Sequence, residues 1–134
     1  MRDHTPLQAW IPLKAPSMNS LLYVIWHQKR LETKPEVRLF RSNFKSYLPP
    51  WEPEITGLYS VRFSFHADWY YKNGSLRRED APNLIKCCLD ALCERYSLED
   101  AQVWHLSCEK VHAPERPGIE VWMEASSLGA IHHS

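Results

Sequence analysis

Apolar and polar residues repeat along this chain with two different periods. Residues 33–48 and 82–96 carry apolar side chains at helical spacing, whereas residues 7–13, 59–65, 103–111 and 119–123 have the pattern of strands. In the clearest strand, Tyr59, Val61, Phe63 and Phe65 alternate with polar residues, which predicts one buried and one exposed face. The order β-α-β-α-β-β predicts a small α/β (mixed α+β) domain, whose mixed sheet carries two helices on one face.

Local signals mark the ends of both predicted helices. The first begins with Thr33-Lys-Pro35-Glu36, a capping box that satisfies two backbone amides, and it ends at Pro49-Pro50. The second begins near Pro82, which makes Asp80 a candidate N-cap. Within it, Lys86 and Asp90 have the i,i+4 spacing of a simple helix ion pair. Glu99 and Asp100 are expected to open the next strand.

The composition is that of a single globular domain. The chain has 134 residues, of which 44% are hydrophobic, and it has no segment apolar enough to cross a membrane. No apolar stretch follows a basic N-terminus, so no signal peptide is expected. Cys87, Cys88, Cys93 and Cys108 lack zinc-binding spacing and are expected to be reduced, structural thiols, as in a cytoplasmic protein. Residues 126–134 are expected to form a flexible tail.

Charge is distributed unevenly, although the formal net charge is zero. Residues 1–78 contain 12 Lys and Arg against 6 Asp and Glu, whereas residues 79–134 contain 4 against 10. A basic half beside an acidic half suits a nuclease, in which cations hold the DNA backbone and carboxylates hold a metal ion. Ordinary variation in a water-soluble protein would give the same counts.

Several cations are candidates for binding DNA. Arg38, Arg41 and Lys45 recur at helical spacing, which predicts either a track for phosphates or a solvated helix face. The segment from Asp68 to Arg78 interleaves aromatic and cationic residues around an Asn-Gly turn and is predicted to be a protruding hairpin or loop. Its aromatic residues, Trp69 among them, are equally compatible with core or dimer contacts. The full set of candidates is Lys29, Arg30, Arg38, Arg41, Lys45, Lys72, Arg77, Arg78 and Lys110.

The strongest pattern spans the second helix and the start of the next predicted strand. It reads Asp80-Ala-Pro-Asn83-Leu-Ile-Lys86-Cys-Cys-Leu-Asp90-Ala-Leu and then Glu99-Asp100-Ala-Gln-Val103. This stretch resembles the RusA-type Holliday junction resolvases, whose signature is roughly D-x-D-N-x-x-K-x-x-x-D-A-L followed by D-D-A-Q-V. The resemblance implies a RusA-like nuclease domain over residues 1–125. It also implies a homodimer that acts on branched DNA such as a four-way junction, and a bacterial or phage-infected cell as the setting.

The same resemblance implies roles for individual residues. Asp80, Lys86 and Asp100 would be catalytic, with Asp80 and Asp100 as ligands of Mg²⁺ (or Mn²⁺), and Asn83 and Asp90 would support them. One position departs from the signature, because the family's second aspartate is Pro82 here and a proline offers no metal ligand. The nearby acids Glu79, Glu99 and Glu109 are candidates to replace it.

Two functions of different class remain. The first is a Mg²⁺-dependent endonuclease that resolves Holliday junctions or other branched DNA by phosphodiester hydrolysis in recombination and repair. The second is a catalytically impaired relative that binds branched DNA, or a protein partner, without cutting it. Pro82 favours the second function, whereas the joint retention of Asp80, Lys86, Asp90 and Asp100 favours the first.

Overall fold

The computed structural model describes residues 5–12, 35–53, 57–70, 72–74 and 82–126, apart from the side chains of residues 35–37 and 82–84. Its elements, in chain order, are strand β1 (Leu7–Pro12), helix α2 (Pro35–Ser46), strand β2 (Tyr59–Ala67), helix α3 (Pro82–Tyr96), a short 3₁₀ turn η2 (Asp100–Gln102), strand β3 (Val103–His112) and strand β4 (Gly118–Ala125). This order confirms the predicted β-α-β-α-β-β arrangement.

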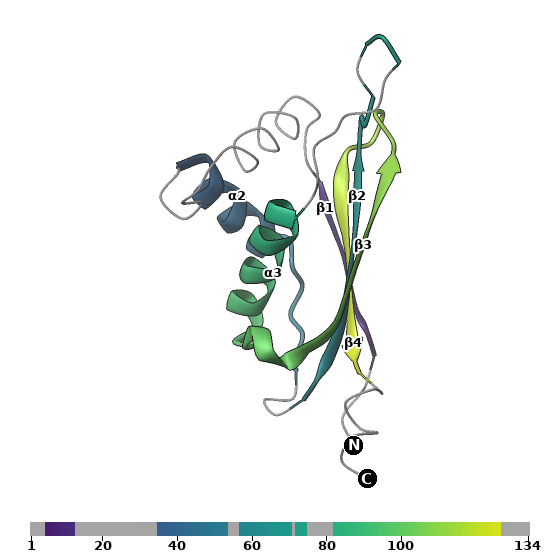
Figure 1. Cartoon of the computed structure of the whole chain (residues 1–134). Helices are drawn as coiled ribbons and strands as arrows, with labels where there is room; N and C mark the ends of the chain where they lie inside the picture. Colours follow the sequence, from purple (N-terminus) through teal and green to yellow (C-terminus); the bar gives the residue numbers. More distant parts are fainter. Residues whose placement is uncertain (1–4, 13–34, 54–56, 71, 75–81, 127–134) are drawn as a thin grey trace.

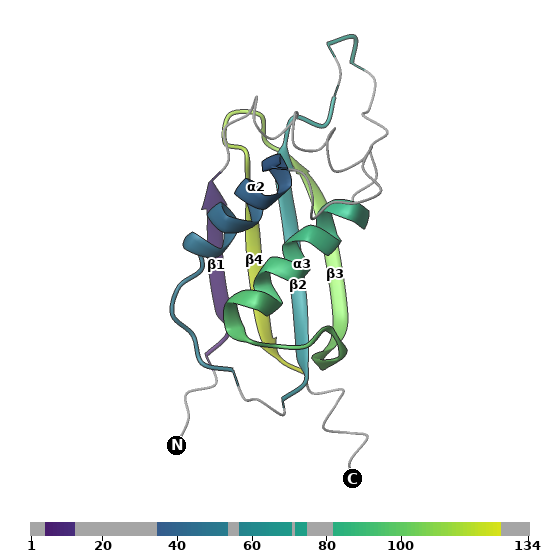
Figure 2. The ribbon, with the colours of Figure 1, turned by 90° about the vertical axis from the view of Figure 1, so that its left-hand side faces the viewer.

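The four strands form one mixed sheet in the order β1-β4-β2-β3. Strands β1 and β2 both pair with β4 in antiparallel fashion, whereas β2 and β3 are parallel and are joined through α3. Both helices lie on the same face of this sheet (Figure 1), and in Figure 2 they cross in front of it. The predicted two-layer domain is therefore correct.

The core lies between the helices and the sheet. The predicted alternation in β2 holds, because Tyr59, Val61, Phe63 and Phe65 are all buried on the helix side. Phe44 of α2 is fully buried, and its ring lies 6.5 Å from that of Phe63. Burying such large aromatic side chains removes much apolar area from water, which is the main force that holds helices on a sheet.

The C-terminal end of α3 is closed by a local backbone motif. Ser97 adopts a positive φ of 56°, and the amide of Leu98 donates to the carbonyl of Cys93 at 2.9 Å. This 6→1 bond with a left-handed residue is the Schellman arrangement, and the buried side chain of Leu98 supplies its usual apolar contact. The chain then enters the 3₁₀ turn at Asp100, so the expectation that Asp100 opens a strand is wrong, and β3 begins at Val103.

Some expectations for the chain ends and loops can be compared with the structure. Trp69 is buried in the core, which decides between the two interpretations of that side chain. The backbone amide of Ser126 donates to the carbonyl of Leu58 at 2.7 Å, so the last described residue is tied to the sheet. Residues 127–134 lie outside the described part, and a flexible tail there stays a prediction.

Candidate functional site

The parallel pair β2–β3, with α3 between its strands in sequence, defines two ends of the molecule. The carboxyl ends of β2 and β3 lie at the same end of the sheet as the start of α3, because α3 runs back antiparallel to both strands. In open α/β sheets this is the end where ligands usually bind. Asp80 and Asn83 belong to this end by chain connectivity, although Asp80 and the side chain of Asn83 lie outside the described part.

Lys86 projects from the first half of α3. Its side chain is exposed and makes no ion pair with any of the residues that the structure describes. The simple helix ion pair between Lys86 and Asp90 is therefore not formed. An exposed ammonium near a helix start is well placed to hold a phosphate, because both the helix dipole and the charge attract anions there.

Asp100 lies at the other end of α3. It accepts a hydrogen bond from Cys93, and both Asp100 and Asp90 lie close enough to act on that thiol electrostatically. Burial, followed by the charge and hydrogen bond of Asp100, raises the pKa of Cys93 to about 12. The helix rises about 16 Å between Pro82 and Cys93 at ~1.5 Å per residue. Within one chain the structure thus groups Asp100 with Asp90 and not with the start of α3.

The other candidate acids have structural partners. Gln102 holds the η2 turn, since its side-chain oxygen accepts from the amide of Glu99 at 3.0 Å and its side-chain nitrogen donates to the carbonyl of Gly57 at 2.9 Å. Glu109 accepts a 2.7 Å hydrogen bond from Ser64. These two residues pair across β2 and β3 on the face of the sheet opposite the helices, so Glu109 lies away from α3 in its own chain.

The cations of α2 are engaged in a way that the sequence did not indicate. Arg41 and Lys45 both bind the carboxylate of Glu94 on α3, at 2.9 and 2.8 Å. Mainly through the bond and charge of Lys45, they hold the pKa of Glu94 below its ordinary value. Arg38, one turn earlier, is exposed. The predicted track therefore carries one exposed arginine and two cations that share an acid. Glu94 has no signal in the sequence, because only the packing of α2 on α3 brings it there.

The remaining predicted DNA contacts divide between the described part and the rest. Lys72 is exposed in the turn that contains Gly74, whose positive φ of 87° suits a glycine. Lys110 lies on the helix side of β3, with its ammonium 4.9 Å from the ring centre of Trp69. Lys29, Arg30, Arg77 and Arg78 lie outside the described residues.

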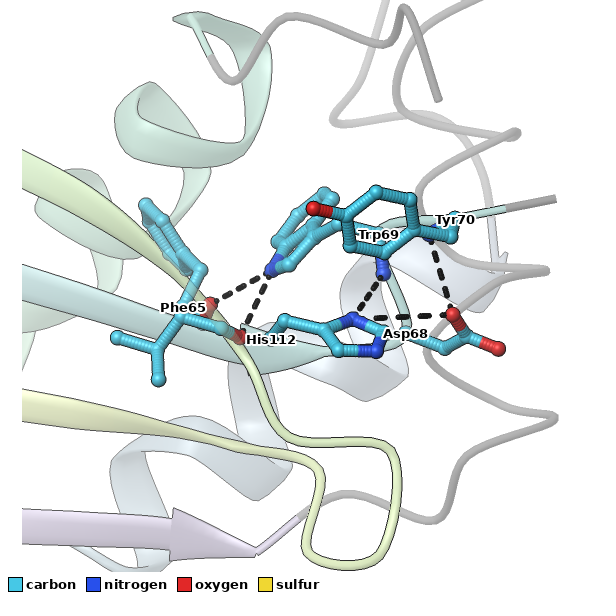
Figure 3. Close-up of polar contacts among 6 residues, drawn as sticks. Phe65, Asp68, Trp69, Tyr70 and His112 are labelled. Carbon is cyan, nitrogen blue, oxygen red and sulfur yellow. Dashed lines mark hydrogen bonds and ion pairs between the residues drawn. The ribbon is translucent and has the colours of Figure 1, made fainter. Parts of the chain in front are cut away.

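One polar cluster at the carboxyl ends of β2 and β3 was not foreseen (Figure 3). His112 Nδ1 accepts from the backbone amide of Trp69 at 3.3 Å and lies 3.9 Å from Asp68 Oδ1. Asp68 in turn accepts from the amide of Tyr70 at 3.1 Å, and the ring of Tyr70 packs edge-on against His112. The local Asp68–Tyr70 turn was readable from the sequence. Its union with a histidine 44 positions later was not, because it depends on the parallel pairing of β2 with β3.

A divalent cation would find oxygen ligands here but no complete cage. The described residues contain no group of three or more His, Cys, Asp or Glu side chains placed to hold a metal ion. Asp90 and Asp100 do supply two carboxylates near one another, and carboxylates are the hard ligands that Mg²⁺ prefers. Mg²⁺ commonly uses only one or two protein carboxylates and keeps several waters. The donor chemistry therefore fits Mg²⁺, with a site that needs further ligands.

Comparison with known families decides the relationship. A family model described as "Endodeoxyribonuclease RusA" matches residues 23–124, which span both helices, the η2 turn and all but the first strand. The chain belongs to the RusA endodeoxyribonuclease family. Members of this family act on Holliday junctions and are generally dependent on divalent metal ions. No curated protein matches the chain. None of the helices in the described part is long and apolar enough to span a membrane.

Proposed function

We propose that this RusA-family protein is a Mg²⁺-dependent endonuclease that cuts Holliday junctions or closely related branched DNA as a homodimer. The observation that carries the proposal is the family match over residues 23–124, which includes Lys86, Asp90 and Asp100 in register. An exposed Lys86 and an exposed Asp100 on the scaffold of α3 support it. The protein would work in the cytoplasm of a bacterial or phage-infected cell, where such junctions arise.

In the proposed reaction, the chain's own residues bind and orient the scissile phosphate. Asp80 and Asp100, with Asp90 in support, would hold the cation, which supplies an activated water and neutralises charge on the phosphate. Lys86 would stabilise the negative charge that develops on the phosphate oxygens, and a preorganised cation is worth most where water is excluded. Lys72 and Arg38, both exposed, would contact the backbone on either side.

Pro82 supports the competing function, a protein that binds junctions without cutting them. Pro82 is the first residue of α3, where a proline is favourable because its missing amide has no helical partner in any case. The substitution is therefore compatible with the fold while it removes a carboxylate. Outer-shell ligand losses typically lower metal affinity by about 10–100-fold, so the loss of a direct ligand should weaken Mg²⁺ binding by at least that much.

Cleavage of a labelled synthetic four-way junction tests the proposal, with linear duplex as the comparison substrate and with Mg²⁺, Mn²⁺ or EDTA. We expect metal-dependent paired nicks on the junction, which Asp80→Asn, Asp100→Asn or Lys86→Ala lowers by at least about 100-fold. Glu115→Gln, at an exposed acid in the turn before β4, is the matched control and should leave cleavage unchanged.

Pro82→Asp separates the two functions. If the wild-type protein cuts and Pro82→Asp lowers the Mg²⁺ concentration needed for half-maximal rate, the enzyme works with an incomplete ligand set. Tight junction binding with cleavage only in Pro82→Asp would establish the binding protein. Neither binding nor cutting would reject both functions.

A further inference from the structure

Strand β3 is the edge of the sheet and is exposed on both of its faces. Among the described strands it has a neighbour on one side only, β2. From Trp104 to Lys110 each residue is exposed except Ser107, which is half-buried. The helix layer thus stops short of this strand (Figure 2). Long exposed edges are sites of strand pairing between chains, and proteins that stay monomeric usually shorten or cover them.

The edge also carries large apolar side chains in the open. Trp104 is 46% exposed and Leu106 is 43% exposed, and both lie within the same strand. Single exposed apolar residues need no explanation, but two of them on an edge with an available backbone mark a contact surface. Aromatic residues are moreover the ones that most often anchor protein interfaces.

We propose that β3 pairs with β3 of a second copy, antiparallel, about a two-fold axis that passes through Ser107. This inference rests on the proposed homodimer and assigns its interface. A two-fold axis perpendicular to a sheet makes two identical strands antiparallel and keeps each residue on its own face. The two sheets then become one sheet of eight strands, and both helix layers lie on the same side.

The register about Ser107 follows from complementarity along the regular part of β3. His105 falls opposite Glu109 of the second copy, so an imidazole meets a carboxylate on the face away from the helices. Leu106 falls opposite Cys108 on the helix side, which gives an apolar pair. The two-fold axis makes each of these pairs twice, and directly opposed partners of this kind stabilise antiparallel strands.

The next pair is also favourable, and neighbouring registers lose these contacts. Trp104, at the bulge where β2 and β3 change register, falls opposite Lys110, a pairing of ring and cation. An axis through Cys108 would instead oppose Leu106 to Lys110, and an axis through Leu106 would oppose Val103 to Glu109. Both alternatives place an apolar side chain against a charge, so the axis at Ser107 is preferred.

The first test is the mass of the protein in solution, without DNA. We expect sedimentation equilibrium to give twice the 15.8 kDa of one chain. The pair Trp104→Asp and Leu106→Asp should raise the dimer dissociation constant by at least about 30-fold, the effect of losing one interface hot spot. Leu39→Asp, on α2, is the control: Leu39 is 63% exposed and distant from β3, so the dimer should persist.

A cross-linking test keeps the proposal falsifiable if the double variant does not fold. Ser107→Cys in a Cys108→Ser background places two thiols across the axis, where opposed Cβ atoms lie ~4.5–5.5 Å apart, and mild oxidation should give a covalent dimer. Gln8→Cys on the other edge, in the same background, should not cross-link.

Three results would overturn the interface or its register. They are a wild-type monomer, a dimer that withstands the aspartates, and faster cross-linking of the wild-type protein through Cys108 than of the Ser107→Cys variant. Because no DNA is involved, a monomer that still cuts junctions would reject the interface alone and leave the proposed nuclease standing.

Discussion

At the scale of single residues, the four cysteines differ in their surroundings and therefore in reactivity. Burial raises the pKa of Cys87 to about 11 and, with the help of Asp100, that of Cys93 to about 12. It raises the pKa of the fully buried Cys88 as well. Cys108 is exposed on β3. Since the thiolate is the nucleophile, buried thiols with raised pKa values react slowly.

We therefore expect iodoacetamide to label only Cys108 of the native protein near pH ~8, and all four thiols after denaturation. Mass spectrometry of tryptic peptides measures the labels. The protein should be dilute, because the proposed dimer places Leu106 of a second copy opposite Cys108. Cys108→Ser is the control and should abolish native labelling. Rapid native labelling of Cys87 or Cys93 would show that α3 opens readily.

Residue-level chemistry was readable from the sequence where it depends on neighbours in the chain. The capping potential at the start of α3, the buried cysteines and the exposed Lys86 all follow from helical spacing. Contacts between distant residues were not readable. Glu94 binds two cations of α2, and His112 meets Asp68, only because tertiary packing and strand pairing bring them together.

At the scale of elements, Glu94 joins the two helices through Arg41 and Lys45. The folded protein holds the pKa of Glu94 below its ordinary value of 4.5. A lowered pKa means that the ion pairs stabilise the fold above about pH 4.5 and that this stability is lost as the pH falls through the lower, folded value. The carboxylate is half-exposed, so solvent screening limits the gain to roughly 0.2–1 kcal/mol.

Glu94→Gln should accordingly lower the free energy of unfolding by that amount at pH ~7 and leave it unchanged at pH ~3, as measured by urea denaturation. Glu52→Gln, at an exposed acid between α2 and β2, is the matched control and should have no such pH-dependent effect. The same substitution of Glu94 releases Arg41 and Lys45. Junction affinity should therefore rise if α2 contacts the DNA backbone, and equal affinity in the two variants would place the DNA elsewhere.

The elements themselves were largely predictable, because periodicity is a local property. Six predicted segments match the strands and helices of the structure, and only the entry to β3 differs, where Asp100–Gln102 form a 3₁₀ turn. Strand order was not predictable from the pattern. The last strand inserts between β1 and β2 and leaves β3 at the edge, a result of long-range pairing that no short segment encodes.

At the scale of the whole molecule, α3 separates the two halves of the predicted metal site. Asp80 precedes Pro82 by two residues, which reach at most ~7 Å of extended chain. Asp100 contacts Cys93 about 16 Å further along the helix. A second copy paired through β3 changes this arrangement, because the start of its β3 lies beside the end of the first. Asp100 of one copy then approaches the end of the molecule from which α3 of the other begins.

This geometry predicts that the two aspartates act across the dimer, which mixed dimers can test. Asp80→Asn and Asp100→Asn should each be inactive alone, yet a dimer that contains one of each keeps one intact pair. Co-refolding equal amounts makes about half of the dimers mixed, so junction nicking should return to about a quarter of the wild-type number of sites. The control replaces Asp100→Asn by the double variant Asp80→Asn/Asp100→Asn, which offers no intact pair in any dimer. No recovery in the first mixture would place both aspartates of each site in one chain, and the loop before α3 would then have to turn back along the helix to reach Asp100.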